Sequence, residues 1–317
     1  MTVLHRLSLL GAALALVGCA SVSPDGLRGD VAQLTAGRTA GVQAALPAAD
    51  AAAKAQAQES IQRWLAEPLT QDAAVRIALL NNPGLQARLA ALGVADAERV
   101  QAITLPNPHF TLGRFANSHE REIERTLAFS LLDLITLPWR TERQAERLQI
   151  ATLQAAQDVV TLAADTRRAW LRAVAAEQVA ATHERMVEAA EAGTELARRM
   201  ASVGNWSRLQ LAREQAVLHE AHRQRARARL AAATAREDLN RRLGVWGKQE
   251  QYQLAAQLPP LPAAALPADG IETTALRERL DVQAARRQLD TQAVRVGWSR
   301  AGTVFGDIGL AYSRNTA

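Results

Sequence analysis

The sequence predicts a mainly α-helical protein built on one long antiparallel helical hairpin, accompanied by short segments with the length of transmembrane β-strands. Three observations carry this prediction. A long heptad pattern forms the hairpin, two alternating apolar and polar runs precede it, and part of the earlier sequence recurs after it. Aromatic residues make up only 4% of the chain, while alanine dominates its apolar content, which suits long helices better than a compact core.

The first 18 residues resemble an export signal peptide. Arg6 precedes an apolar run from Leu7 to Val17, which is shorter than the about 20 residues a bilayer-spanning helix needs. Cys19 is the only cysteine of the chain, so it cannot form an internal disulfide. Its surroundings resemble a bacterial lipobox, which predicts attachment of acyl chains such as palmitate to Cys19. Ala20 resembles the residue of lipoproteins sent to the outer membrane. An ordinary signal peptide with an incidental cysteine is the alternative.

Residues 19–68 are alanine-rich and polar with little periodicity, which predicts a lipid-anchored tether or a segment lying on another part of the molecule. A helical pattern follows from residue 69 to about residue 104. Thr70 is a suitable N-cap, and Pro83 predicts a break or a kink.

Two extended runs follow, at about 107–116 and 122–131, joined by the polar residues 117–120. The second run alternates well, with Arg125 as the one charged residue on its apolar face. Runs of this length match transmembrane β-strands. An isolated pair would leave backbone groups unpaired in lipid, so several copies would have to close a barrel. A small soluble hairpin is the alternative.

The long hairpin is predicted at about 139–243. Its first helix lacks proline from Arg140 to Ser202, and its small and apolar residues alternate at spacings of four and three, as in a coiled coil. Gly204 or Asn205 suits a left-handed helix end, and Ser207 with Gln210 forms a capping box for the return helix. Alanine-rich seams bury little area per helix, so we expect an oligomer. A structural two-helix coiled coil is the alternative. The two seams are Ala155, Val159, Leu162, Thr166, Ala169, Ala173, Ala176, Ala180, His183, Val187, Ala190, Thr194, Ala197 and Ala201, and Leu211, Leu218, Ala221, Ala228, Ala232, Ala235 and Leu239.

A proline-rich linker at 248–268 separates the hairpin from a partial repeat at 269–317. Ala275-Leu276 repeats Ala78-Leu79 at an offset of 197, and Gln283-Ala284 and Leu289 repeat Gln86-Ala87 and Leu92 at the same offset. The repeat predicts a second helix to about residue 300, followed by a third extended run.

In this order, the elements resemble those of TolC-like outer membrane efflux channels. The residues that carry the resemblance are Cys19, Leu69-Thr70-Gln71-Asp72-Ala73-Ala74, Asn82-Pro83-Gly84-Leu85, Leu105-Pro106-Asn107-Pro108 and Val203-Gly204-Asn205-Trp206-Ser207-Arg208-Leu209. The resemblance makes 69–247 a first efflux-channel repeat and implies a homotrimer with a shared β-barrel above a periplasmic α-barrel. A complete family member would continue with a fourth strand and a second hairpin, so we expect this chain to be a truncated channel.

The resemblance also implies a function. It predicts the outer-membrane channel of a tripartite efflux system, a passive conduit for small molecules or ions. Its partners would be a periplasmic adaptor, an inner-membrane pump and outer-membrane lipid. The adaptor would contact the hairpin tip, formed by Val203, Gly204, Asn205, Trp206 and Ser207. The alternative is a lipid-anchored periplasmic adaptor or a structural coiled-coil protein without a pore.

Other functions lack sequence support. The net charge is +5 and arginines are frequent on the return helix, but no nucleic-acid-binding motif accompanies them. No phosphate loop or nucleophile motif indicates an enzyme or a cofactor. His219 and His222 are spaced to share a metal on a helix, but no third ligand is evident, so we expect no metal site.

Overall fold

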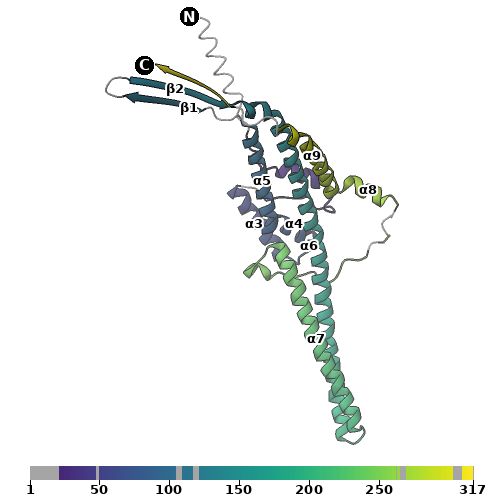
Figure 1. The fold of residues 1–317 in the computed structure, drawn as a ribbon. Helices are drawn as coiled ribbons and strands as arrows, with labels where there is room; N and C mark the ends of the chain where they lie inside the picture. Colours follow the sequence, from purple (N-terminus) through teal and green to yellow (C-terminus); the bar gives the residue numbers. More distant parts are fainter. Residues whose placement is uncertain are drawn as a thin grey trace. The chain divides into compact units, whose positions relative to one another are not determined.

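The computed structural model describes residues 21–47, 50–104, 109–116, 121–261, 263–264, 269–302 and 309–316. The fold is mainly α-helical with a long helical hairpin and a few strands, as predicted (Figure 1). Residue contacts divide it into two compact units, one of 1–31, 89–155 and 270–317 and one of 32–88 and 156–269. Cys19 and the predicted signal peptide lie outside the described residues.

The N-terminal segment contains two helices that its sequence pattern did not predict, α2 (Arg28–Thr35) and α3 (Ala51–Ala66). The backbone N–H of Ala53 donates to Asp50 Oδ1 over 2.7 Å and begins α3. Alanine favours helix without needing a periodic apolar face, which explains why periodicity missed this helix. The fully buried Ile61 joins α3 to the core, and the partly buried Trp64 and Leu65 of the same helix pack against it.

Helices α4 (Gln71–Asn81) and α5 (Pro83–Ile103) confirm the predicted break. The N–H of Ala73 donates to Thr70 Oγ1 over 3.2 Å, so Thr70 is the N-cap. Asn82 has extended backbone angles between the helices, as expected for a residue before proline.

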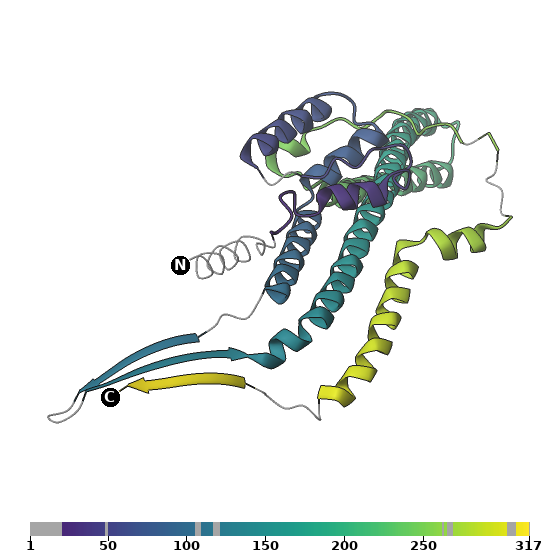
Figure 2. The ribbon, with the colours of Figure 1, turned by 90° about the horizontal axis from the view of Figure 1, so that it is seen from above.

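The strands form a three-stranded antiparallel sheet in the order β1-β2-β3 (Figure 2). They are β1 (His109–Ala116), β2 (Arg121–Ser130) and β3 (Gly309–Thr316). In the register, Leu112 pairs with Arg125, and Leu127 pairs with Phe110 on one side and Tyr312 on the other. The predicted third run therefore extends the sheet formed by the first two. The polar residues 117–120 lie outside the described residues.

The long hairpin consists of α6 (Leu131–Ser202) and α7 (Arg208–Leu243). The prediction that the first helix begins at about residue 139 was wrong, because α6 includes Pro138. Proline removes one backbone donor, and α6 continues through that missing hydrogen bond. The predicted seams are confirmed, since none of their members is exposed. Of the helices that the structure describes, none combines the length and apolar content needed to cross a membrane.

The core of the second unit lies where α3 and α4 pack on the hairpin near the C-terminal end of α7, away from the hairpin tip. It joins Ile61, Ile77, Trp170 and Leu239, all buried. The indole N–H of Trp170 donates to the Leu69 carbonyl over 2.8 Å.

The predicted linker begins as part of this core. After the 3-10 turn η1 (Gly247–Glu250), Tyr252 is 3% exposed and Leu254 is 9% exposed. The Leu69 N–H donates to the Gln253 carbonyl over 2.8 Å. The prolines later in this segment led us to predict a linker throughout, so the buried residues at its start were not predicted.

The repeat is visible in the backbone of α8 (Ile271–Glu278) and α9 (Leu280–Gly302). We predicted one helix here, but it breaks at Arg279, the residue equivalent to Asn82 at the offset of 197. The Gln283 amide donates to the Arg277 carbonyl over 2.9 Å, as the Gln86 amide donates to that of Leu80 over 3.2 Å. The two copies differ in burial: Leu79 and Leu92 are 1% and 2% exposed, and their equivalents Leu276 and Leu289 are 56% and 71% exposed.

Candidate functional site

The hairpin tip is a tightly hydrogen-bonded turn. Gly204 has φ +78°, the left-handed conformation that glycine adopts without strain. The Asn205 N–H donates to the Met200 carbonyl over 3.0 Å, which closes the end of α6. The Ser207 N–H donates to Gln210 Oε1 over 2.8 Å and the Gln210 N–H donates to Ser207 Oγ over 3.2 Å, so the predicted capping box is present.

The tip is also exposed. Val203 is 69% exposed, Trp206 is half-buried, and Gly204, Asn205 and Ser207 are exposed. Just above it, Glu195 forms ion pairs with Arg199 at 2.9 Å and Arg198 at 2.8 Å. The hydrogen bonds from Arg199 and then Arg198 lower the pKa of Glu195. The tip is therefore an exposed, hydrogen-bonded turn that carries one exposed apolar side chain, Val203, next to a charged pair on α6.

Each helix of the hairpin carries a second heptad seam that the structure leaves largely open. The second seam of α6, called here the outer α6 seam, runs alongside the buried seam and continues to Val203 in the turn. On α7, the outer α7 seam is exposed throughout. Leu196 is 60% exposed and Leu230 is 69% exposed. The outer α6 seam is Val179, Thr182, Met186, Ala189, Gly193, Leu196, Met200 and Val203, and the outer α7 seam is Leu209, Ala212, Ala216, His219, Arg223, Ala226, Leu230 and Ala233.

Ion pairs connect the two helices of the hairpin. Glu184 on α6 binds Arg229 on α7 at 2.5 Å, and Glu177 binds Arg236 at 2.7 Å. The Thr194 hydroxyl, on the buried seam, donates to the Glu214 carbonyl over 3.3 Å. These bonds oppose sliding of α6 against α7.

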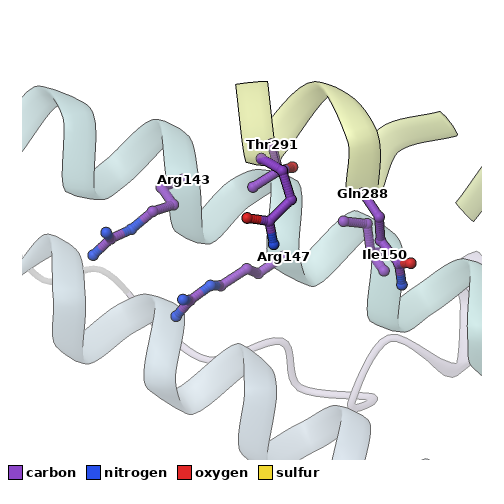
Figure 3. Close-up of a pocket in the computed structure, with 6 residues that line it drawn as sticks. Arg143, Arg147, Ile150, Gln288 and Thr291 are labelled. Carbon is purple, nitrogen blue, oxygen red and sulfur yellow. The ribbon is translucent and has the colours of Figure 1, made fainter. Parts of the chain in front are cut away.

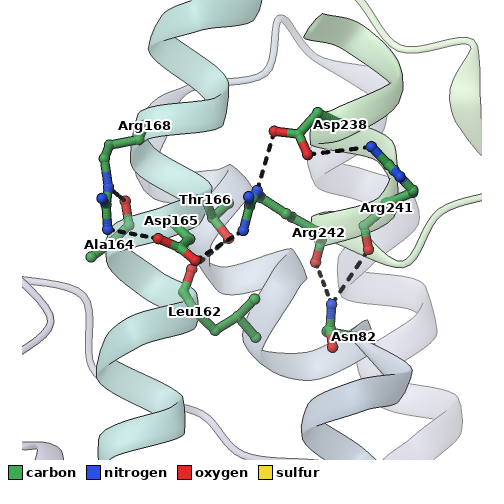
Figure 4. A network of polar contacts seen from close by, with 9 residues as sticks. All are labelled: Asn82, Leu162, Ala164, Asp165, Thr166, Arg168, Asp238, Arg241 and Arg242. Carbon is green, nitrogen blue, oxygen red and sulfur yellow. Dashed lines mark hydrogen bonds and ion pairs between the residues drawn. The ribbon is translucent and has the colours of Figure 1, made fainter. Parts of the chain in front are cut away.

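At the upper end of α7, side chains satisfy the last carbonyls of the helix (Figure 4). The Asn82 amide donates to the Arg242 carbonyl over 2.9 Å, and the Asn81 amide donates to that of Gly244 over 2.7 Å. Arg242 also reaches Asp165 on α6 at 3.0 Å and Asp238 at 3.4 Å. This network joins α4, α6 and α7 at one level.

Tyr252 forms a second polar cluster beside it. Its hydroxyl donates to Asn240 Oδ1 over 2.8 Å, and the Arg236 guanidinium lies 4.5 Å from the centre of its ring. Arg236 also donates to the carbonyls of Glu250 and Tyr252. Burial raises the pKa of Tyr252 to about 12. The cluster attaches the start of the linker to the hairpin.

The segment that follows Cys19 is held on α5 by a buried carboxylate. Asp96 is 1% exposed, accepts a hydrogen bond of 2.6 Å from the Ser23 N–H, and pairs with Arg99 at 2.9 Å. Arg167 on α6 donates to the carbonyl of Ala40 over 3.0 Å. The N-terminal segment is therefore bound to the helices at defined points, which sequence patterns did not reveal.

A hollow of about 350 Å³ lies between α6 and α9 (Figure 3). Arg143, Arg147 and Ile150 line it from α6, and Gln288, Thr291 and Gln292 line it from α9. Beside it, Arg287 on α9 binds Glu146 on α6 at 3.1 Å. Within the described residues there is no cluster of three metal-ligating side chains. His222 lies 3.9 Å from Glu191, and His219 is exposed on the outer α7 seam.

Comparison with known proteins identifies the class of fold. No protein-family model and no curated protein sequence matches the chain. Solved structures do. CusC, described as forming a transmembrane channel, aligns with a TM-score of 0.64 at 18% identity, over 80% of this chain and 62% of CusC. The Campylobacter jejuni CmeC outer membrane channel aligns with a TM-score of 0.64 at 16% identity, over 78% and 61%.

The Neisseria gonorrhoeae MtrE outer membrane channel aligns with a TM-score of 0.58 at 17% identity, over 77% of this chain and 62% of MtrE. This chain therefore has the fold of TolC-like outer membrane channels, the fold that its sequence predicted. It spans less than two thirds of the length of CusC and CmeC.

Proposed function

We propose that this chain forms part of a TolC-like outer-membrane channel of a tripartite efflux system, a passive conduit for small molecules or ions. The observation that carries the proposal is the combination, in one chain and in the channel order, of the β1-β2-β3 sheet with the long α6–α7 hairpin. The strands would join a shared outer-membrane barrel, and the hairpin would extend into the periplasm.

The proposed assembly is a homotrimer, with a periplasmic adaptor and an inner-membrane pump as partners. The outer seams of α6 and α7 support assembly, because exposed apolar heptad seams are typical of helices that pack on both sides. The exposed Leu276 and Leu289, whose equivalents in the first copy are buried, support a further helical partner on α8–α9. Val203 to Ser207 are the proposed adaptor contact.

Anchoring through an acylated Cys19 is the remaining part of the proposal. One lipid anchor gives only reversible membrane binding, so the strands would supply the rest. The bond between Asp96 and the Ser23 N–H supports a defined path for the anchored segment, because it fixes the chain four residues after Cys19.

Cysteine labelling tests the proposal. Ser118→Cys lies in the sequence between β1 and β2, and Asn205→Cys lies at the hairpin tip. In intact Gram-negative cells expressing the chain, a membrane-impermeant maleimide should label Ser118→Cys, and should label Asn205→Cys only after the outer membrane is permeabilised.

The unmutated protein is the control, because its only cysteine is Cys19. If Cys19 is acylated, it has no free thiol and the unmutated protein should not be labelled. Purified protein should also migrate as a heat-sensitive trimer on a gel. Equal labelling of both positions, together with monomeric migration, would contradict a channel.

A further inference from the structure

The β1–β2 sheet has two chemically different faces. One face carries Phe110, Leu112 and Leu127, which are 66%, 63% and 43% exposed. The other carries Thr111, Gly113, Glu124 and Thr126, where the Thr126 hydroxyl donates to Glu124 Oε1 over 3.3 Å. In a membrane-spanning barrel, the apolar face meets lipid and the polar face meets water. The first face is therefore the lipid-facing one.

Two arginines interrupt the lipid-facing side. Arg114 pairs across the strands with Ile123, and Leu112 pairs with Arg125, so the two arginines are diagonal neighbours on one face. Diagonal neighbours in an antiparallel sheet lie about 7–8 Å apart, within reach of long side chains. Both side chains are exposed, and among the residues that the structure describes neither has a hydrogen-bond or ion-pair partner.

The arginines lie toward the free end of the strands. Phe110 and Leu127 lie nearer the helices, and Arg114 is third from the end of β1. A guanidinium that faces hydrocarbon is costly, and the cost falls near the membrane surface, where polar headgroups begin. Two adjacent guanidinium groups also repel each other unless an anion lies between them. Their planar donors match phosphate oxygens, and several N–H groups can converge on one phosphate.

We propose that Arg114 and Arg125 form a binding site for the phosphate group of a lipid headgroup at the outer end of the sheet. The inference rests on the proposed insertion of these strands in the outer membrane and adds a ligand to it. The bound phosphate neutralises both arginines and marks the level at which the hydrocarbon layer ends. Phe110, Leu112 and Leu127 pack against the acyl chains below it.

The test compares two lipids with the same acyl chains on the full chain purified in detergent micelles. Dioctanoyl phosphatidylglycerol carries the phosphate, and dioctanoylglycerol lacks it. Native mass spectrometry counts the lipid retained at each concentration. The unmutated chain should retain the phosphate lipid at about tenfold lower concentration than dioctanoylglycerol, because charge-assisted bidentate hydrogen bonds hold it. The double variant Arg114→Gln/Arg125→Gln should show no such preference.

A matched control replaces two other exposed arginines, Arg213 and Arg227 on α7, with glutamine, and should keep the preference. Arg114→Lys/Arg125→Lys keeps both charges, covers the case in which the glutamine variant fails to fold, and should bind with intermediate affinity. Equal retention by the unmutated chain and the glutamine or lysine variants would overturn the site. Displacement of the lipid by millimolar inorganic phosphate would show a free-phosphate site and overturn the lipid assignment.

Failure of this site is distinguishable from failure of the proposed function. Labelling of Ser118→Cys from outside the cell reports insertion of the strands. If that labelling succeeds and the glutamine variant binds lipid as the unmutated chain does, the phosphate site alone is wrong.

Discussion

At the scale of single residues, Tyr252 shows how one side chain anchors a proline-rich segment. Its ring is buried under the Arg236 guanidinium and its hydroxyl donates to Asn240. Burial raises the pKa of Tyr252 from 10.0 to about 12. Deprotonation would remove the hydrogen bond and leave a buried phenolate, so the folded protein holds this proton more tightly than the unfolded chain does.

The first prediction concerns pH. Because the pKa of Tyr252 is raised by folding, its contribution to stability is complete below pH 10 and is lost as the pH rises toward 12. The free energy of unfolding should fall by about 2 kcal/mol across this interval, since each pKa unit corresponds to about 1.4 kcal/mol. Urea unfolding followed by circular dichroism at successive pH values measures it.

Tyr252→Phe is the control. It should cost about 1 kcal/mol at neutral pH, because Asn240 loses a buried partner, and should remove most of the alkaline decrease. An unchanged decrease in the variant would assign it to other groups.

The turn after α7 requires glycine at position 244. Its φ is +67°, and an added Cβ would lie 2.6 Å from the Asn81 carbonyl oxygen. Gly244→Ala should destabilise the second unit by about 1–3 kcal/mol, as expected for a strained backbone position with a steric clash. Thermal unfolding measures the loss. Gly247→Ala is the matched control. Its φ of +61° is similar, but no atom lies within 4 Å of the added Cβ, so it should cost less.

At the scale of elements, the hairpin tip tests capping chemistry separately from packing. Ser207 is exposed, and its backbone N–H and hydroxyl bond to Gln210 in the first turn of α7. Ser207→Ala should destabilise the start of α7 by about 1 kcal/mol. Amide hydrogen exchange should accelerate from residue 208 through the first turns of α7. The core around Trp170 should keep its protection, and loss of protection there would show that the tip is coupled to the whole unit.

The elements also show where sequence patterns succeed. The heptad seams, the Thr70 cap, the break at Pro83 and the capping box at Ser207 depend on local spacing, and the structure confirms each. The pattern placed the start of α6 too late, because proline usually marks a helix boundary, whereas α6 continues through Pro138. It missed α3, where alanine forms a helix without a periodic face.

At the scale of the whole molecule, the outer seams predict how copies assemble. Ala189 on α6 and His219 on α7 lie on the two outer seams at similar distances from the tip. A mixture of Ala189→Cys chains and His219→Cys chains, each with Cys19 replaced by serine, should form disulfide-linked dimers after mild oxidation. Neither variant alone should, because the proposed contact joins different faces of neighbouring copies.

Ala192→Cys is the matched control, because Ala192 is exposed on α6 near the same level but off the outer seam. It should not cross-link to His219→Cys. Cross-linking of Ala189→Cys to itself would indicate a two-fold contact and contradict a ring.

The sequence by itself determined the helical hairpin, its turn, the strand pairs, the repeat and the class of fold, because each depends on spacing along the chain. Only the tertiary structure decided which distant groups meet. The hydrogen bond from the Ser23 N–H to Asp96, the hydrogen bond from Asn82 to the end of α7, and the contact between Arg236 and the Tyr252 ring are examples. The tertiary structure also paired Leu112 with Arg125, and so brought Arg114 beside Arg125. Such contacts depend on strand register and helix packing, which fix positions in space that no local pattern records.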